Sequence, residues 1–216
     1  MTMTAAREMA PQLPPPLPHF GHIRRTWDAD LGVSVARLLP GEYYVTQHNE
    51  AIFTVLGSCV SACVRDRKLG IGGMNHFMLP LDRSGGMTAW SDSPVSSATR
   101  YGNVAMERLI NDIMNLGGQR ANLEFKVVGG GKVLNMALDV GARNAEFVRE
   151  YLRTEGFHIA AEDLGDTFAR KLFYSPATGR VRMKRLTATV NKAVFEREWE
   201  FEPTTAQVES GSVELF

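Results

Sequence analysis

The sequence predicts a mixed α/β domain in which strands outnumber helices. Runs of β-branched and aromatic residues recur between residues 43 and 79 and again between residues 157 and 186, which is typical of strands. Two stretches between these runs carry apolar residues at helical spacing. A chain of 216 residues with 44% hydrophobic and 22% charged residues also has the size and composition of one globular domain.

The strand-rich part is expected to begin with two strands at residues 43–45 and 51–56, separated by the turn-prone residues 47–49. Residues 60–64 and 71–79 flank the charged connection Arg65-Asp66-Arg67-Lys68, with Gly70 just after it. Apolar strands on either side of such a turn predict a β-hairpin.

The second half of the chain mixes helices and strands. Residues 101–116 place apolar side chains on one helical face and are followed by Gly117-Gly118, so they predict an amphipathic helix. Residues 144–154 predict a second helix. Further strands are expected at residues 123–128, 157–161, 169–174 and 180–186.

Three segments are distinguished by composition. Residues 1–35 include the run Pro14-Pro15-Pro16 and are expected to form a flexible, Pro-rich N-terminal extension outside the core. Residues 36–191 are expected to form the folded domain. Residues 192–216, with the acidic run EREWEFE, predict a flexible C-terminal tail whose apolar tip, Val213-Glu214-Leu215-Phe216, suits docking into a groove or folding back.

Charge and apolar patterning limit the partners. Twenty-four basic and 24 acidic residues cancel, so no overall field attracts nucleic acid or an anionic membrane. No stretch approaches the roughly 20 apolar residues that span a bilayer, and the start lacks a signal-peptide pattern. We therefore expect a cytoplasmic protein without membrane insertion, in which Cys59 and Cys63 are free thiols.

Cys59 has two interpretations. A cysteine in an apolar run is usually a small buried core residue. However, Gly57-Ser58 directly precede the thiol, so the chain can bend there and point backbone amides at an oxygen beside the sulfur, as a nucleophile of acyl transfer requires. Cys63 is expected to pack in the core.

A nucleophilic cysteine needs a base, because only the thiolate attacks. The predicted hairpin gives His76 a route to the face of Cys59, while His48 and His158 are alternatives. Thr54 is a candidate third member, since its hydroxyl or backbone carbonyl would orient the imidazole.

Two other chemistries are weaker matches. Cys59, Cys63 and His76 would give a zinc ion three ligands, without a fourth or the paired spacing of structural zinc sites. Gly129-Gly130-Gly131-Lys132 lacks the spacing of a phosphate-binding P-loop. A glycine turn that brings backbone close to a site is the better interpretation of that run.

Short motifs follow one another along the chain: Leu56-Gly57-Ser58-Cys59-Val60, Gly73-Met74-Asn75-His76-Phe77-Met78-Leu79-Pro80, Arg100-Tyr101-Gly102, Ala105-Met106-Glu107, residues 126–131, Gly141-Ala142-Arg143-Asn144 and Glu162-Asp163-Leu164-Gly165. This series resembles the CheD family of chemoreceptor glutamine deamidases over about residues 42–186. The resemblance implies an α/β (α+β) layered sandwich of mixed β-sheets with packed helices, related to the catalytic fold of glutamine-deamidating toxins.

The resemblance also implies a site. It assigns Cys59 as nucleophile, His76 as base and Thr54 as the orienting residue, with no cofactor and no metal. We expect three further residues to position the oxyanion or the substrate: Gly57, Ser58 and Asn75. The implied reaction converts specific glutamines of methyl-accepting chemoreceptors to glutamate through a thioester, the activity of a protein-glutamine glutaminase.

Two alternatives remain at this point. One is a non-catalytic adaptation module that binds chemoreceptors or a CheC-type phosphatase, a partnership that the resemblance also implies. The other keeps the cysteine hydrolase but gives it a small amide as substrate.

Overall fold

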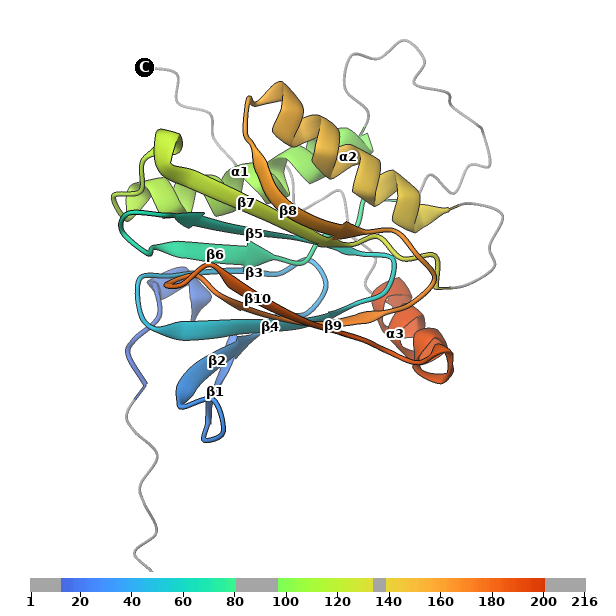
Figure 1. Cartoon of the computed structure of the whole chain (residues 1–216), viewed down its shortest axis with the longest axis horizontal. Helices are drawn as coiled ribbons and strands as arrows, with labels where there is room; N and C mark the ends of the chain where they lie inside the picture. Colours follow the sequence, from blue (N-terminus) through green and yellow to red (C-terminus); the bar gives the residue numbers. More distant parts are fainter. Residues whose placement is uncertain (1–12, 81–96, 134–138, 201–216) are drawn as a thin grey trace, which may run out of the picture.

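The computed structural model describes residues 13–80, 97–133 and 139–200, which form three layers (Figure 1). Two five-stranded mixed sheets stack on each other, and helices α1 (Ser97–Asn115) and α2 (Val140–Thr154) cover the outer face of one of them. This confirms the predicted layered α+β class. Within the described residues, no helix combines the length and apolar character needed to cross a membrane.

The first sheet has the order β1-β2-β4-β9-β10. Its strands are β1 (Arg24–Asp28), β2 (Val33–Arg37), β4 (Glu50–Leu56), β9 (Arg170–Ser175) and β10 (Arg180–Arg185). The pair β2 and β4 is parallel, and the other neighbours are antiparallel. Strand β4 is therefore a central strand, with pairing partners on both sides that hold its backbone in place.

The second sheet has the order β3-β6-β5-β7-β8. Its strands are β3 (Tyr43–Thr46), β6 (Gly72–Asn75), β5 (Val60–Asp66), β7 (Leu123–Gly129) and β8 (Ile159–Leu164). Strands β5 and β6 form the predicted antiparallel hairpin, and Gly70 takes a positive φ of 70° in its turn. The chain crosses from the first sheet to the second between β4 and β5.

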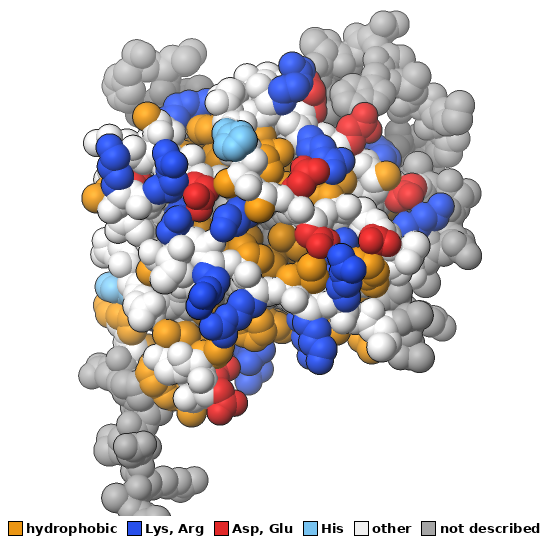
Figure 2. Space-filling view, viewed as in Figure 1, with side chains coloured by type: hydrophobic (Ala, Val, Ile, Leu, Met, Phe, Trp, Pro, Cys, Tyr) orange, Lys and Arg blue, Asp and Glu red, His pale blue; other side chains and the backbone are white. Residues whose placement is uncertain are grey.

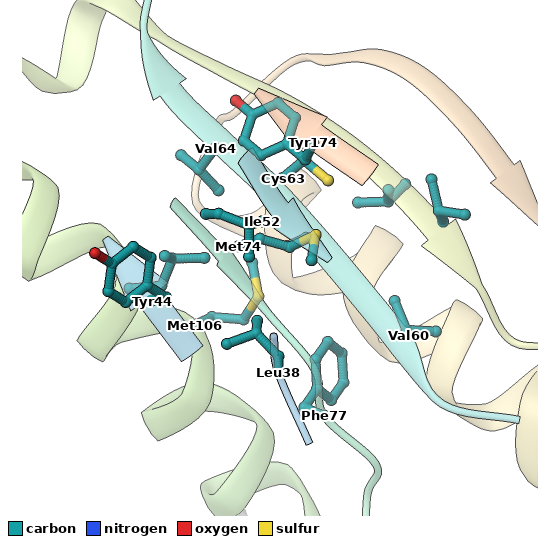
Figure 3. Packing of buried hydrophobic residues seen from close by; sticks show 14 of the residues in the cluster. Leu38, Tyr44, Ile52, Val60, Cys63, Val64, Met74, Phe77, Met106 and Tyr174 are labelled. Carbon is teal, nitrogen blue, oxygen red and sulfur yellow. The ribbon is translucent and has the colours of Figure 1, made fainter. Parts of the chain in front are cut away.

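The main hydrophobic core fills the space between the sheets and beneath α1 and α2. Figure 3 shows part of it, including Ile52, Met74, Met106 and Cys63. Cys63 is 1% exposed and belongs to this cluster, which confirms its predicted packing role. On the face drawn in Figure 2, basic and acidic side chains are interspersed, as expected from a net charge of zero.

The structure corrects the expected N-terminal boundary. Residues 24–37 contain strands β1 and β2, so residues 24–35 of the expected extension belong to the first sheet and the turn within it. Phe20 is fully buried, with ring centroids 5.0 Å from Tyr43 and 5.1 Å from Tyr44. Aromatic packing begins within a few residues of the proline run, since Phe20 follows Pro18 by only two positions.

The C-terminal boundary also differs from the expectation. Residues 188–200 form helix α3 (Ala188–Glu200), which lies beside the connection between β4 and β5 in Figure 1. Glu198 on this helix is 1% exposed, so this part of the expected tail joins the folded body. The Val213–Phe216 tip lies outside the described residues.

Candidate active site

The connection between β4 and β5, residues 57–59, is held from one side by three hydrogen bonds to its carbonyl groups. The donors are Gly131 N to Gly57 O at 2.9 Å, Asn144 Nδ2 to Ser58 O at 2.9 Å, and Gly130 N to Cys59 O at 2.8 Å. Because these contacts use only the carbonyl groups of residues 57–59, the backbone N–H groups of the same residues remain available to bind another group.

A glycine turn at residues 129–131 makes this close approach possible. Gly129 has a φ of 123°, and a Cβ there would lie 2.2 Å from Cys59 O. A Cβ on Gly131 would lie 3.0 Å from Gly57 O. A side chain at position 129 would therefore push the two backbones apart. The glycine run thus brings its backbone close to the 57–59 connection, which contains the candidate nucleophile.

Sequence reasoning assigned no role to Asn144, which is fully buried on α2. Besides donating to Ser58 O, it accepts from Leu79 N at 2.9 Å through Oδ1. The available signal was a polar residue next to the apolar face of the predicted helix, since a buried amide requires partners. Asn144 thus fixes both the 57–59 connection and the end of the His76 segment.

His76 is oriented by Thr54, which lies on the central strand β4. Thr54 Oγ1 is 2.7 Å from His76 Nδ1 and 3.0 Å from Leu38 O. A carbonyl oxygen only accepts, so the single hydroxyl proton of Thr54 goes to Leu38 O. His76 Nδ1 must then carry the proton and donate it to Thr54 Oγ1, which leaves Nε2 as the basic nitrogen of the neutral ring.

The hairpin brings His76 to the face of Cys59. Val60 and Phe77 form an isolated antiparallel bridge, and the residues just before them, Cys59 and His76, both point to the other face of this pair. Cys59 Sγ and a ring nitrogen of His76 lie within 4.8 Å of each other. Of the three candidate histidines, His76 is therefore the one that the structure brings to the thiol.

The backbone N–H groups of residues 57–59 face the carboxylate of Glu198, a residue that the sequence did not indicate as part of the site. Gly57 N donates to Glu198 Oε1 at 2.7 Å, and both N and Oγ of Ser58 donate to Oε2, at 2.8 and 2.9 Å. Cys59 N lies 3.3 Å from Oε1 and 3.4 Å from Oε2. Three consecutive amides thus converge on one acidic group, an arrangement that favours anions.

His76 Nε2 faces the same carboxylate without a hydrogen bond. It lies 3.7 Å from Glu198 Oε1, which is ion-pair distance. Among the described residues it has no hydrogen-bond partner, although it is buried. The basic nitrogen is therefore available to a group that enters between Cys59 and Glu198.

The electrostatics of the site depend on Glu198. Burial raises the pKa of Cys59 well above its ordinary value, and the charge and hydrogen bonding of Glu198 raise it further. Burial alone would also raise the pKa of Glu198, but the His76 ring in its protonated form and the Gly57 amide outweigh that effect and lower it. In this arrangement the thiol is neutral, whereas a nucleophile needs the thiolate.

Cys59, His76 and Glu198 could together offer a metal ion three ligand atoms, which lie within 4.8 Å of one another. However, the two carboxylate oxygens already accept hydrogen bonds from backbone N–H groups. These dipoles point their positive ends into the site, so it favours a carboxylate or a developing oxyanion over a cation.

The remaining candidate, Asn75, has its amide engaged away from this cluster. Its Oδ1 accepts from Ala62 N at 2.8 Å, and its Nδ2 lies 3.4 Å from both Ala105 O and Met106 Sδ. These contacts tie β6 to β5 and α1. Asn75 therefore supports strand β6, which ends directly before His76, while Gly57 and Ser58 contact Glu198 beside Cys59.

Comparison with known proteins places the chain in a family. The family described as "CheD chemotactic sensory transduction" matches residues 78–185. A protein of Halorhodospira halophila named "Probable chemoreceptor glutamine deamidase CheD" is 52% identical over the whole of both chains. Proteins of the same name from Hahella chejuensis and Hydrogenovibrio crunogenus are 49% and 45% identical, covering 95% and 90% of this chain and 97% and 100% of their own. The chain belongs to the CheD family.

Proposed function

We propose that this protein is a chemoreceptor glutamine deamidase that uses Cys59 as nucleophile, His76 as base and Thr54 to orient the base. The observation that carries the proposal is the geometry around Cys59. An imidazole whose Nε2 is kept basic by Thr54 and a row of three convergent amides flank the same thiol. The names of the relatives supply the substrate, the side-chain amide of a receptor glutamine.

In the first half of the reaction, His76 Nε2 takes the proton of the Cys59 thiol as the sulfur attacks the carboxamide carbon. The carbonyl oxygen becomes negative and is stabilised by the amides of residues 57–59, which already hold a charged oxygen in this structure. The carbon–nitrogen bond then breaks, and the imidazolium gives its proton to the departing ammonia. A thioester remains on Cys59.

In the second half, a water molecule enters where ammonia left. His76 Nε2 takes a proton from this water, and the oxygen attacks the thioester carbon. The carbon–sulfur bond breaks, the thiol recovers its proton from His76, and the product is a glutamate side chain. Overall, one water is consumed and one ammonia is released, so no cofactor is required by the balance.

The setting follows from the same proposal. We propose a cytoplasmic setting, a compartment that the reduced state of Cys59 and Cys63 suits. The reaction is that of a protein-glutamine glutaminase. A CheC-type phosphatase is a proposed further partner, on the resemblance of the sequence alone.

A second candidate function is favoured by one observation. Cys59 is fully buried and its pKa is raised, as expected of a binding module whose thiol takes no part in chemistry. The two candidates differ in whether receptor glutamines change chemically.

The test incubates a receptor cytoplasmic fragment with wild type, with Cys59→Ala and with Cys63→Ala, followed by peptide mass spectrometry. We expect specific glutamines to be converted to glutamate by wild type and by Cys63→Ala, but not by Cys59→Ala. Cys63→Ala is a matched control because it removes the other buried thiol. Equal conversion by all three proteins, or by none, would refute the mechanism. Addition of free glutamine to the same assay distinguishes a protein substrate from a small amide. Strong inhibition of receptor conversion would indicate a small-amide substrate, whereas no inhibition would indicate a protein substrate.

A further inference from the structure

Glu198 presents to Cys59 the chemical group that glutamine deamidation leaves behind. Its carboxylate meets the amides of Gly57 and Ser58 and lies beside Cys59 and His76. We propose that α3 is an internal product mimic, in which Glu198 fills the position of the deamidated substrate side chain and closes the site until a substrate helix displaces it. This inference rests on the proposed function and adds to it a substrate geometry and a regulatory contact.

The fit of the carboxylate is specific to a product. Both of its oxygens are met by N–H donors, and Ser58 Oγ donates to one of them. A glutamine side chain offers only one oxygen, so its amide nitrogen would face the backbone N–H of Gly57 or of Ser58, and both of these groups are donors. The site therefore binds a glutamate more completely than a glutamine, as a site occupied by product would.

Glu198 reaches the 57–59 connection from a helix, which indicates the kind of substrate that would fit there. It projects from a helix into the connection between β4 and β5, at one end of the stacked sheets (Figure 1). Val194 lies four residues earlier, on the same face of α3, and it belongs to a small cluster with Val133, Ala169 and Leu186. A glutamine on an external helix, with a small apolar residue one turn before it, would reproduce both contacts.

The backbone at Gly57 is shaped for this docking. A Cβ at that position would lie 2.9 Å from Glu198 Oε2 and 3.2 Å from Val194 Cγ1. The absence of a side chain thus lets both the carboxylate and the apolar residue of α3 approach the backbone. A substrate helix that replaced α3 would use the same space.

Glu198 holds α3 to the 57–59 connection and Val194 holds it to a small apolar cluster, and a substrate helix would displace both contacts. This apolar cluster is separate from the main core, and Val194 is only partly buried within it. Among the described side chains of α3, the buried polar anchor is the carboxylate of Glu198. While it stays in place, Cys59 is fully covered and its thiol is kept neutral by burial and by the adjacent negative charge. The docked form is therefore inactive toward an external glutamine.

The test compares Glu198→Ala and Val194→Asp with wild type, with Val190→Asp as matched control. Val194→Asp retains Glu198 but places a charge against Val133 and Ala169, whereas Val190 lies exposed on the same helix. We expect both test variants to raise the rate of iodoacetamide alkylation of Cys59 and the rate of receptor glutamine conversion. A gain of about tenfold corresponds to about 1.4 kcal/mol of docking free energy. Val190→Asp is expected to behave as wild type.

The outcomes separate the two proposals. If wild type converts receptor glutamines and neither test variant is faster in conversion or alkylation, the product mimic is refuted and the deamidase stands. If no protein converts receptor glutamines, the proposed function fails, and unchanged alkylation in Glu198→Ala would then also show that α3 does not cover Cys59. Folding of each variant is checked by its urea unfolding midpoint, because a globally unfolded protein would expose Cys63 to alkylation as well.

Discussion

At the scale of single residues, the state of His76 follows from one hydroxyl group. Thr54 cannot donate to both Leu38 O and His76 Nδ1, so the proton on Nδ1 is fixed by the carbonyl on the far side of the threonine. The imidazole then presents its basic nitrogen to Cys59. In the proposed mechanism Thr54 acts through His76 and is therefore a positioning residue.

This assignment predicts the effect of Thr54→Val, which removes the hydroxyl but retains the branched shape. We expect kcat to fall by about tenfold or more with little change in KM, because proton transfer by His76 loses its orientation. Thr54→Ser should restore most of the rate, since it returns the hydroxyl. The measurement is receptor glutamine conversion over a range of pH. A valine variant as fast as wild type would show that Thr54 is only a strand residue.

At the scale of elements, the site lies on the connection between β4 and β5, which joins the two sheets. Hydrogen bonds from a glycine turn and from helix α2 hold this connection in place. The glycine turn after β7 holds the carbonyls of Gly57 and Cys59, and α2 holds that of Ser58 through Asn144. With its carbonyls fixed, the connection presents its amides without reorganisation when charge develops on a substrate oxygen. In the proposed mechanism, the oxyanion site is thus built before substrate arrives.

Asn144→Leu tests this view of the connection. The substitution keeps a similar side-chain size but leaves Ser58 O and Leu79 N buried without their partner. We expect a loss of about 1–3 kcal/mol in the free energy of unfolding for each unpaired group, and a fall in kcat larger than the change in KM. Urea unfolding and steady-state kinetics measure the two effects. Unchanged kcat in a variant with the expected loss of stability would assign Asn144 to folding alone.

How far the sequence predicted this site depends on the range of the contacts. The β5–β6 hairpin and helix α1 have local signals, alternation and helical spacing, and both were predicted. Cys59, His76 and Thr54 were found through a motif and a hairpin. Glu198 lies in a run that reads as a polar acidic tail, and its burial depends on amides that lie about 140 residues earlier. No local pattern encodes such a contact.

The missed strands at the N-terminus have a different cause. Strand β1 alternates little and contains Arg24 and Arg25, because it is an edge strand that is partly exposed on both faces. Edge strands carry charged residues and so lack a strong apolar signal. Arg25 is nevertheless mostly buried, because it pairs with Glu50.

At the scale of the whole molecule, Glu50 joins the two sheets. It lies on β4 of the first sheet, and its carboxylate accepts a hydrogen bond from Arg25 Nε of β1 at 3.0 Å. It also accepts hydrogen bonds from the hydroxyls of Tyr44 and Thr46 of the second sheet, at 2.9 and 2.6 Å. Burial alone would raise the pKa of Glu50, but the hydrogen bonds from Thr46, Arg25 and Tyr44 lower it overall. The ionised form is therefore the one that stabilises the sandwich.

A pH dependence of stability follows from this lowered pKa. The contribution of Glu50 is fully present above its unfolded pKa of about 4.3 and is lost as the pH falls through the lower folded value. We expect Glu50→Gln to lower the free energy of unfolding by about 3–5 kcal/mol at neutral pH. Below about pH 5, the stability of the variant should fall less steeply than that of wild type, because residue 50 can no longer be protonated. Urea unfolding midpoints at several pH values below about 5 measure this. Parallel profiles for wild type and variant would contradict the prediction.

The most direct test of the account is the chemical fate of a glutamine placed where Glu198 lies. Glu198→Gln presents a carboxamide to Cys59 within the protein itself, so Cys59 attack, loss of ammonia and hydrolysis by water would convert residue 198 back to glutamate. Peptide mass spectrometry of the purified variant reads this residue directly, with Cys59→Ala/Glu198→Gln as control. We expect glutamate at position 198 in the single variant and glutamine in the double variant. Glutamine retained in both would contradict it.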